Sequence, residues 1–111
     1  MAGYTRATHF TGLNDTGQNI TAGIARVSHI NAFNRSAATA FIQIFDLAAA
    51  SVTLGTTVPL FEILLAATTG FESISFSPPI EFITRMSAFS TTTDGGNTGS
   101  AAGVVLQAWI E

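Results

Sequence analysis

The chain has 111 residues, of which 47% are hydrophobic and only 10% are charged, and its formal net charge at pH 7 is −3. This length is typical of a single domain, and the apolar fraction is high enough to offset the chain entropy that disordered segments retain. All four positive charges are arginines, so the chain lacks the basic patch that binds nucleic acid or an anionic membrane surface. We therefore expect neither a nucleic-acid nor a membrane partner.

Residues 1–23 are predicted to form an N-terminal arm and linker, because TGLNDTGQNITAG at 11–23 is rich in Gly, Thr and Asn. The arm lacks the apolar stretch of a signal peptide, and no segment reaches the length of a membrane span, so we expect synthesis in a cytoplasm. Residues 24–111 are predicted to form one β-sandwich domain. Its short apolar runs, rich in Phe, Ile, Val and Thr, predict strands at 24–34, 38–47, 58–66, 71–77, 82–92 and 103–110.

Turn residues separate these runs. NRSA (34–37) and ATTG (67–70) are typical of hairpin connections, and SPPI (77–80) is expected to end its run because proline cannot donate to a sheet ladder. DLAAAS (46–51) is expected to hold a helical turn. Residues 60–67 contain good helix formers, but Pro59 and the short length favour a strand.

The predicted fold is an all-β antiparallel sandwich with a jelly-roll-like strand order, and an immunoglobulin-like order is the alternative. One face of each strand should build the core, but in three runs the second face is largely apolar as well. Such a face belongs either to an unusually large core or to a subunit interface, and the small size of the chain favours the interface. The candidate interface residues are Phe41, Phe45, Phe61 and Trp109.

No residue pattern predicts catalysis. His9 and His29 lack a second histidine at metal-ligand spacing, the carboxylates are scattered singly, and there is no cysteine. The loop TDGGNTG (93–99) lacks the lysine of a phosphate-binding loop and offers calcium a single carboxylate, Asp94. We therefore expect no enzyme activity, no metal and no cofactor. The aromatic residues also allow a carbohydrate-stacking surface, although they lie within the strand runs.

A set of motifs over residues 33–111 resembles a module of small virion proteins of tailed bacteriophages. The motifs are IQIFD (42–46), LGTTVP (54–59), FSPP (76–79) and SAFSTTTD (87–94). None of them is catalytic. The resemblance implies a capsid decoration (cement) protein, which binds the outside of the major capsid protein, often as a homotrimer, and stabilises the head.

On this hypothesis the chain is located on the capsid exterior, and its partners are further copies of itself and the major capsid protein. The N-terminal arm, with Tyr4, Arg6, His9 and Phe10, is the candidate capsid contact. The alternative is a fibre-head or lectin-like module that recognises a host surface glycan. An enzyme is the third and least supported reading.

Overall fold

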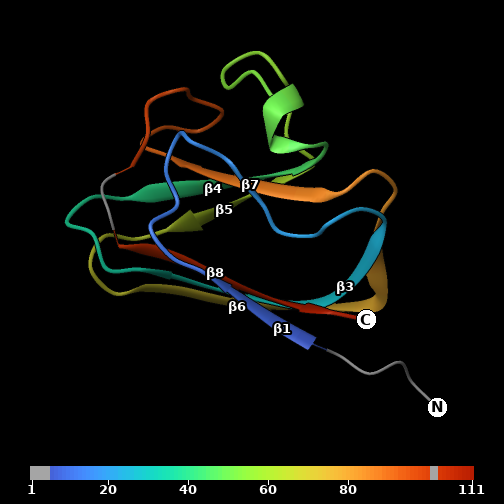
Figure 1. Cartoon of the computed structure of the whole chain (residues 1–111). Coiled ribbons are helices and arrows are strands. Elements are labelled where there is room, and N and C mark those ends of the chain that lie inside the picture. Colours follow the sequence, from blue (N-terminus) through green and yellow to red (C-terminus); the bar gives the residue numbers. More distant parts are fainter. Residues whose placement is uncertain (1–5, 101–102) are drawn as a thin grey trace.

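The computed structural model describes residues 6–100 and 103–111 (Figure 1). Within them the regular structure is β-sheet together with one turn of 3₁₀ helix, η1 (Ala49–Ser51). The strands are β1 (Arg6–Phe10), β2 (Gln18–Asn19), β3 (Ala25–Asn34), β4 (Ala40–Asp46), β5 (Phe61–Leu65), β6 (Gly70–Phe82), β7 (Met86–Thr91) and β8 (Val104–Ile110). No helix in this described part has the length and apolar character needed to traverse a bilayer.

The strands form two antiparallel sheets that lie one above the other (Figure 1). The first sheet has the order β1-β8-β3-β6, and the second has the order β2-β7-β4-β5. Every connection between consecutive strands passes from one sheet to the other, except the β4–β5 connection, which stays within the second sheet. The prediction of an all-β, antiparallel, two-sheet fold is confirmed.

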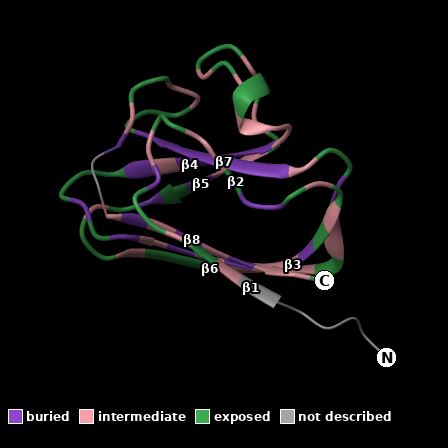
Figure 2. Ribbon diagram, viewed as in Figure 1, coloured by how far each residue is buried: buried purple, intermediate pink, exposed green. Residues whose placement is uncertain are grey.

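The core lies between the two sheets and is built by alternate residues of each strand (Figure 2). In β8, Val104, Leu106 and Ala108 are fully buried, whereas Gln107 and Trp109 point to the outer face of the first sheet. Alternation of this kind follows from the pleat, which directs successive side chains to opposite faces. Fully buried core residues from the other strands include Val27, Ile30, Ile42, Ile44, Phe82 and Met86.

A buried asparagine fastens two sheet-crossing connections at one end of the sandwich. Asn34, at the end of β3, donates from Nδ2 to the carbonyl oxygens of Ala38, Leu65 and Ala66 at 2.8, 3.2 and 3.1 Å. Its Oδ1 accepts from the backbone N–H and the hydroxyl of Ser36. The side chain therefore ties the β3–β4 turn to the β5–β6 turn.

At the opposite end, Asp46 holds the connection between β6 and β7. Its carboxylate accepts hydrogen bonds from the backbone N–H groups of Ile83, Thr84 and Arg85 at 3.0, 2.8 and 3.2 Å. Bonds from backbone donors to a carboxylate are stronger than neutral ones. The aspartate thus fixes the path by which the chain returns from the first sheet to the second.

The outer face of the second sheet is covered by the chain's own loops, and we call it the covered face. Its central side chains are almost fully buried, with Phe45 at 1% and Phe89 at 4% exposure, and their rings pack edge to face at 5.5 Å. The β4–β5 connection (residues 47–60) and the loop at 92–99 rise over this sheet (Figure 1). The second apolar face of β4 is therefore part of an internal core in its central portion.

Hydrogen bonds hold these loops in place. Gln43 Nε2, on the covered face, donates to the carbonyl oxygen of Gly96 at 3.0 Å and to Thr91 Oγ1 at 2.9 Å. Glu62 accepts from the N–H of Gly95 at 3.1 Å. The β1–β2 connection also contributes, because its Gly17 lies so close to Phe89 that a Cβ there would stand 2.1 Å from the ring.

Two predicted hairpins are wrong. NRSA connects β3 of the first sheet to β4 of the second, and ATTG connects β5 of the second sheet to β6 of the first. Both turns span the gap between the sheets rather than joining neighbouring strands. Local turn composition identifies a reversal of the chain but not the strand with which the next segment pairs.

The prediction that SPPI ends a strand is also wrong, because β6 continues through both prolines to Phe82. β6 is an edge strand, where a missing N–H costs little if it would face solvent. The ladder to β3 is nevertheless irregular here, with a register shift between Val27 and His29 opposite the segment that contains Pro78 and Pro79.

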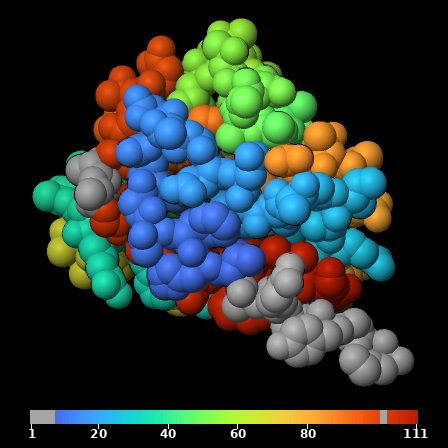
Figure 3. Space-filling model, in the orientation of Figure 1, coloured from blue at the N-terminus to red at the C-terminus, as the bar shows by residue number. Residues whose placement is uncertain are grey.

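The structure gives no separate arm and linker over its described part of residues 1–23. β1 pairs with β8, β2 pairs with β7, and Leu13 between them is fully buried in the core. In Figure 3 the blue N-terminal segment lies along one side of the molecule between the two sheets. From residue 6 onward this segment is therefore part of the sandwich.

Candidate functional site

The four candidate interface residues do not share one surface. Phe45 is buried under the loops of the covered face, and Phe61 packs against the core, with its ring 6.0 Å from that of Phe76. Phe41 is half-buried at the margin of the covered face, and Trp109 is half-buried on the outer face of the other sheet. Phe45 alone is fully buried, whereas Phe41, Phe61 and Trp109 are each half-buried, and Phe41 and Trp109 lie on opposite faces of the sandwich.

The residues predicted as a capsid-contact arm are mostly within the first sheet. Tyr4 lies outside the described residues, and the backbone of Arg6 pairs with that of Ile110. Phe10 packs against the core. His9 is exposed, and its Nδ1 accepts a hydrogen bond from Gln107 Nε2 at 3.1 Å. Of the described arm side chains, only His9 is freely accessible.

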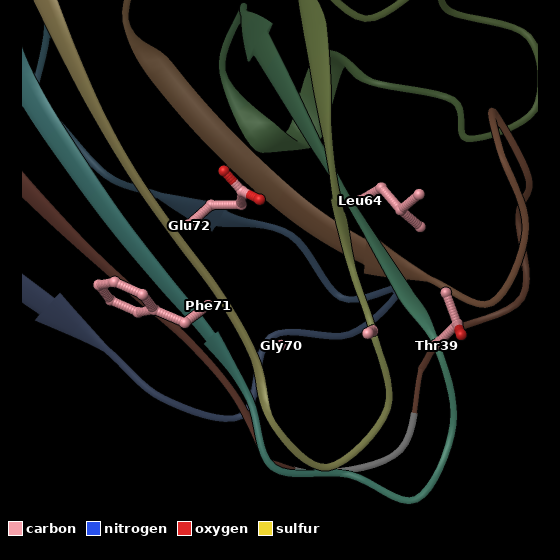
Figure 4. Close-up of a pocket in the computed structure, with 6 residues that line it drawn as sticks. Thr39, Leu64, Gly70, Phe71 and Glu72 are labelled. Atoms are coloured by element: carbon pink, nitrogen blue, oxygen red, sulfur yellow. The ribbon is translucent and has the colours of Figure 1, made fainter.

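The side of the sandwich where the edge strands β5 and β6 meet carries a groove lined by apolar and polar side chains, and we call this side the open edge. One hollow of about 330 Å³ is lined by Leu64, Phe71 and Glu72, together with Thr39, Ala66 and Gly70. Leu64 and Phe71 point away from each other on its two sides (Figure 4). A second hollow of about 300 Å³ also involves Leu64 and Glu72, so the two form one continuous groove.

Large apolar side chains remain exposed along the open edge although the core beside it is complete. Leu64 is 58% exposed and Phe71 is 51% exposed. Leu64 stands opposite Phe41 in the β4–β5 ladder, which extends the apolar surface onto the second sheet. Sequence reasoning missed Leu64 and Phe71 as surface residues, because alternation shows which residues share a face but not which apolar face is buried.

The outer face of the first sheet carries polar and aromatic side chains, and we call it the His–Trp face. The part so named consists of His9, His29, Asn31, Ser73, Ser75, Gln107 and Trp109, and the same outer face continues into an apolar row of Phe33, Phe71 and Val105. His29 contacts Trp109 edge to face, with ring centroids 5.2 Å apart. Its Nδ1 lies 2.8 Å from Ser75 Oγ, and its Nε2 lies 2.8 Å from Asn31 Oδ1. Because an amide oxygen only accepts, Nε2 carries the proton and Ser75 donates to Nδ1.

This arrangement places a hydroxyl, an imidazole and an amide oxygen in the order of a nucleophilic triad. β3 is hydrogen-bonded to β6 and β8 on its two sides, so the ladders occupy its backbone N–H groups. No preorganised oxyanion hole is therefore provided by the strand that carries His29. Among the described residues, no group of three or more His, Asp or Glu side chains is placed to hold a metal ion.

Two carboxyl groups that looked isolated in the sequence meet beneath the loop at 92–99. Glu62, on β5, hydrogen-bonds the side chain of Asp94, and burial together with this contact raises the pKa of Glu62 above its ordinary value of 4.5. The N–H of Gly95 acts in the opposite direction, because it favours the charged carboxylate. The carboxyl group of Glu62 thus contacts the loop at 92–99 through both the side chain of Asp94 and the N–H of Gly95.

Comparison with known proteins gives no relative for this chain. No family model matches it, and neither a curated protein nor a solved structure does. The functional argument therefore depends on the fold, on the two exposed surfaces and on the resemblance of the sequence motifs.

Proposed function

We propose that the chain is a structural virion protein of a bacteriophage, which binds the outside of the capsid as a homotrimer and stabilises the head. The observation that carries this proposal is the open edge. The core of the domain is complete without Leu64 and Phe71, so folding alone does not explain why these two side chains are exposed beside the groove. Exposed apolar surfaces of this kind mark interaction sites.

The strand order supports a jelly-roll classification. Two four-stranded sheets in the orders β1-β8-β3-β6 and β2-β7-β4-β5, with nearly all connections crossing between sheets, are what two successive Greek keys produce. Jelly rolls are common in viral capsid proteins. The classification agrees with the phage resemblance of residues 33–111, which is independent of the strand order.

The composition supports an assembly role as well. Only 10% of the residues are charged, whereas the surface of a small soluble monomer usually carries charge on about a quarter to a third of its residues. Burying part of the surface against further copies relieves this deficit. The open edge lies on one side of the domain, so contact with a different surface of the next copy is head-to-tail and can close into a ring.

The first test is the solution mass by light scattering after size exclusion. We expect a wild-type mass of about three times 11.6 kDa, and Leu64→Asp should reduce it to the monomer mass. Val58→Asp is the matched control, because Val58 is 84% exposed in the β4–β5 connection, away from the groove. A wild-type monomer at micromolar concentration, or equal effects of the two substitutions, would contradict self-association at the open edge.

The second test is cosedimentation with capsids of the encoding phage from which the protein has been removed. We expect the wild-type protein to rebind, and deletion of residues 1–5 to abolish binding while the solution mass stays unchanged. This deletion leaves all strands of the described part intact. Rebinding that is unaffected by the deletion would move the capsid contact to another surface, and failure of the wild-type protein to rebind would overturn the decoration role.

A further inference from the structure

The outer faces of β1, β8, β3 and β6 place polar side chains in a row across the first sheet. His9 stands opposite Gln107, Gln107 stands opposite Asn31, and Asn31 stands opposite Ser73. Each of these residues comes from a different strand, so the row crosses the full width of the sheet. In the next row Trp109 stands opposite His29, and His29 stands opposite Ser75.

We propose that the His–Trp face is a binding site for a neutral carbohydrate. This proposal does not depend on the decoration role, since it concerns the outer face of the first sheet rather than the open edge. Three properties of that face carry the proposal. They are a fixed aromatic ring, one amide atom on each of Asn31 and Gln107 that makes no hydrogen bond within the described part of the protein, and the absence of charge among the described side chains of the two rows.

The indole of Trp109 is held by its neighbour. His29 packs edge to face against it, and His29 is itself fixed by hydrogen bonds to Ser75 and Asn31. The ring is half-buried, so part of it stays accessible to solvent. A ring that is fixed in the unbound protein loses little conformational freedom when a ligand packs against it. The apolar C–H face of a pyranose ring is a suitable ligand surface.

The row beside the indole supplies free hydrogen-bonding groups of both kinds. Asn31 uses its Oδ1 and Gln107 uses its Nε2 in contacts within the face. Within the described part of the chain, Asn31 Nδ2 and Gln107 Oε1 make no such contact. One donor and one acceptor thus remain on adjacent strands, and a sugar hydroxyl can satisfy either, because it both donates and accepts.

The absence of charge on this face determines which class of ligand it can bind. Its side chains are imidazole, amide, hydroxyl and indole groups, and Glu72, next to Ser73 in the chain, pairs with the buried Ala32 and so belongs to the other side of β6. An anionic ligand would find no cation among the described side chains of the two rows. A second copy of the chain would favour the apolar row of Phe33, Phe71 and Val105 beside them, whereas these two rows are polar and aromatic. A neutral glycan matches both the aromatic and the amide groups.

The chain contains a single tryptophan, so its fluorescence reports directly on this face. The probes are neutral oligosaccharides of glucose, mannose, galactose and N-acetylglucosamine, titrated into the full chain, with sialylated oligosaccharides as the charged comparison. We expect at least one neutral probe to change the Trp109 emission with a millimolar or lower Kd. The sialylated probes should bind no more tightly than their neutral counterparts.

Asn31→Ala retains the tryptophan and should raise the Kd at least tenfold. The matched control is Leu64→Asp at the open edge, which should leave the Kd unchanged. The proposal is overturned if no neutral probe binds at 10 mM, if Asn31→Ala has no effect, or if sialylated probes are preferred. It is also overturned if Trp109→Ala lowers the solution mass, because the face would then be an interface between copies. None of these outcomes bears on capsid rebinding, so the two proposals fail separately.

Discussion

The outer faces of the two sheets differ in how far they are buried. The covered face of the second sheet carries Phe45 and Phe89, which are almost fully buried under loops of the same chain. The outer face of the first sheet carries Trp109 and His29, which no loop covers to that extent. Both faces are rich in aromatic residues. The comparison shows that aromatic residues on a second face do not by themselves identify an interface.

The difference comes from the connections. Residues 47–60 and 92–99 fold back over the second sheet, and Gln43 and Glu62 hold the loop at 92–99 there. The covered face is thus a second small core that stabilises the domain, whereas the side chains of the His–Trp face are free for a partner. The first two predictions below change one of the two faces and use the other as the control, and the last two concern the covered face alone.

The largest effect is expected from truncating the aromatic residue of each face. Phe45→Ala should lower the free energy of unfolding by about 3–5 kcal/mol, because it leaves a cavity beside Phe89 under the loops. Trp109→Ala, on the half-buried face, should cost about 1 kcal/mol. Urea unfolding followed by circular dichroism measures both. Similar losses for the two variants would show that the faces do not differ in their contribution to stability.

The two faces also offer a matched pair of glutamines. Gln43→Met removes the donor that holds the carbonyl oxygen of Gly96 and should cost about 1–3 kcal/mol, since that group loses its partner. Gln107→Met on the His–Trp face should stay within about 0.5 kcal/mol of the wild type. The same unfolding assay distinguishes them. A neutral Gln43→Met would mean that apolar contact, and not the hydrogen bond, holds the loop.

A smaller effect is expected from the carboxyl pair under the loop. The pKa of Glu62 is raised in the folded protein, so the folded state binds this proton more tightly than the unfolded state does. The resulting stabilisation is present below the ordinary value of 4.5 and is lost as the pH rises through the folded pKa. Stability measured from pH 4 to pH 8 should therefore fall more for the wild type than for Glu62→Gln.

Asp94→Asn tests the cause of this pH dependence. It removes the neighbouring carboxylate whose hydrogen bond and charge raise the pKa of Glu62. It should therefore flatten the pH profile in the same direction as Glu62→Gln. If both variants keep the wild-type profile, the proton shared between the two side chains makes no contribution to the stability of the loop.

The strands were largely predictable from the sequence, because their apolar runs and turn residues are local signals. Predicted runs at 24–34, 38–47 and 103–110 overlap β3, β4 and β8 almost completely. The helical turn expected within 46–51 is also present as η1. Strand β2 was missed, because its two residues lie in a Gly- and Thr-rich segment without periodicity.

What the sequence did not reveal depends on contacts between distant residues. The alternation of residues correctly placed Leu64 and Leu60 on one face of the strand. It could not show that this face stays exposed, because the residues on the other face of β5 are equally apolar. Glu62 contacts Asp94, and His29 contacts Ser75, although the two residues of each pair are far apart in the chain. No local pattern encodes such pairs.

The prolines of β6 have a consequence for how far assembly can proceed. Neither Pro78 nor Pro79 has a backbone N–H, so this part of β6 offers no donor at two successive residues to a strand from another molecule. Regular pairing of such a strand is therefore interrupted there, and open-ended growth into fibrils along this edge is disfavoured.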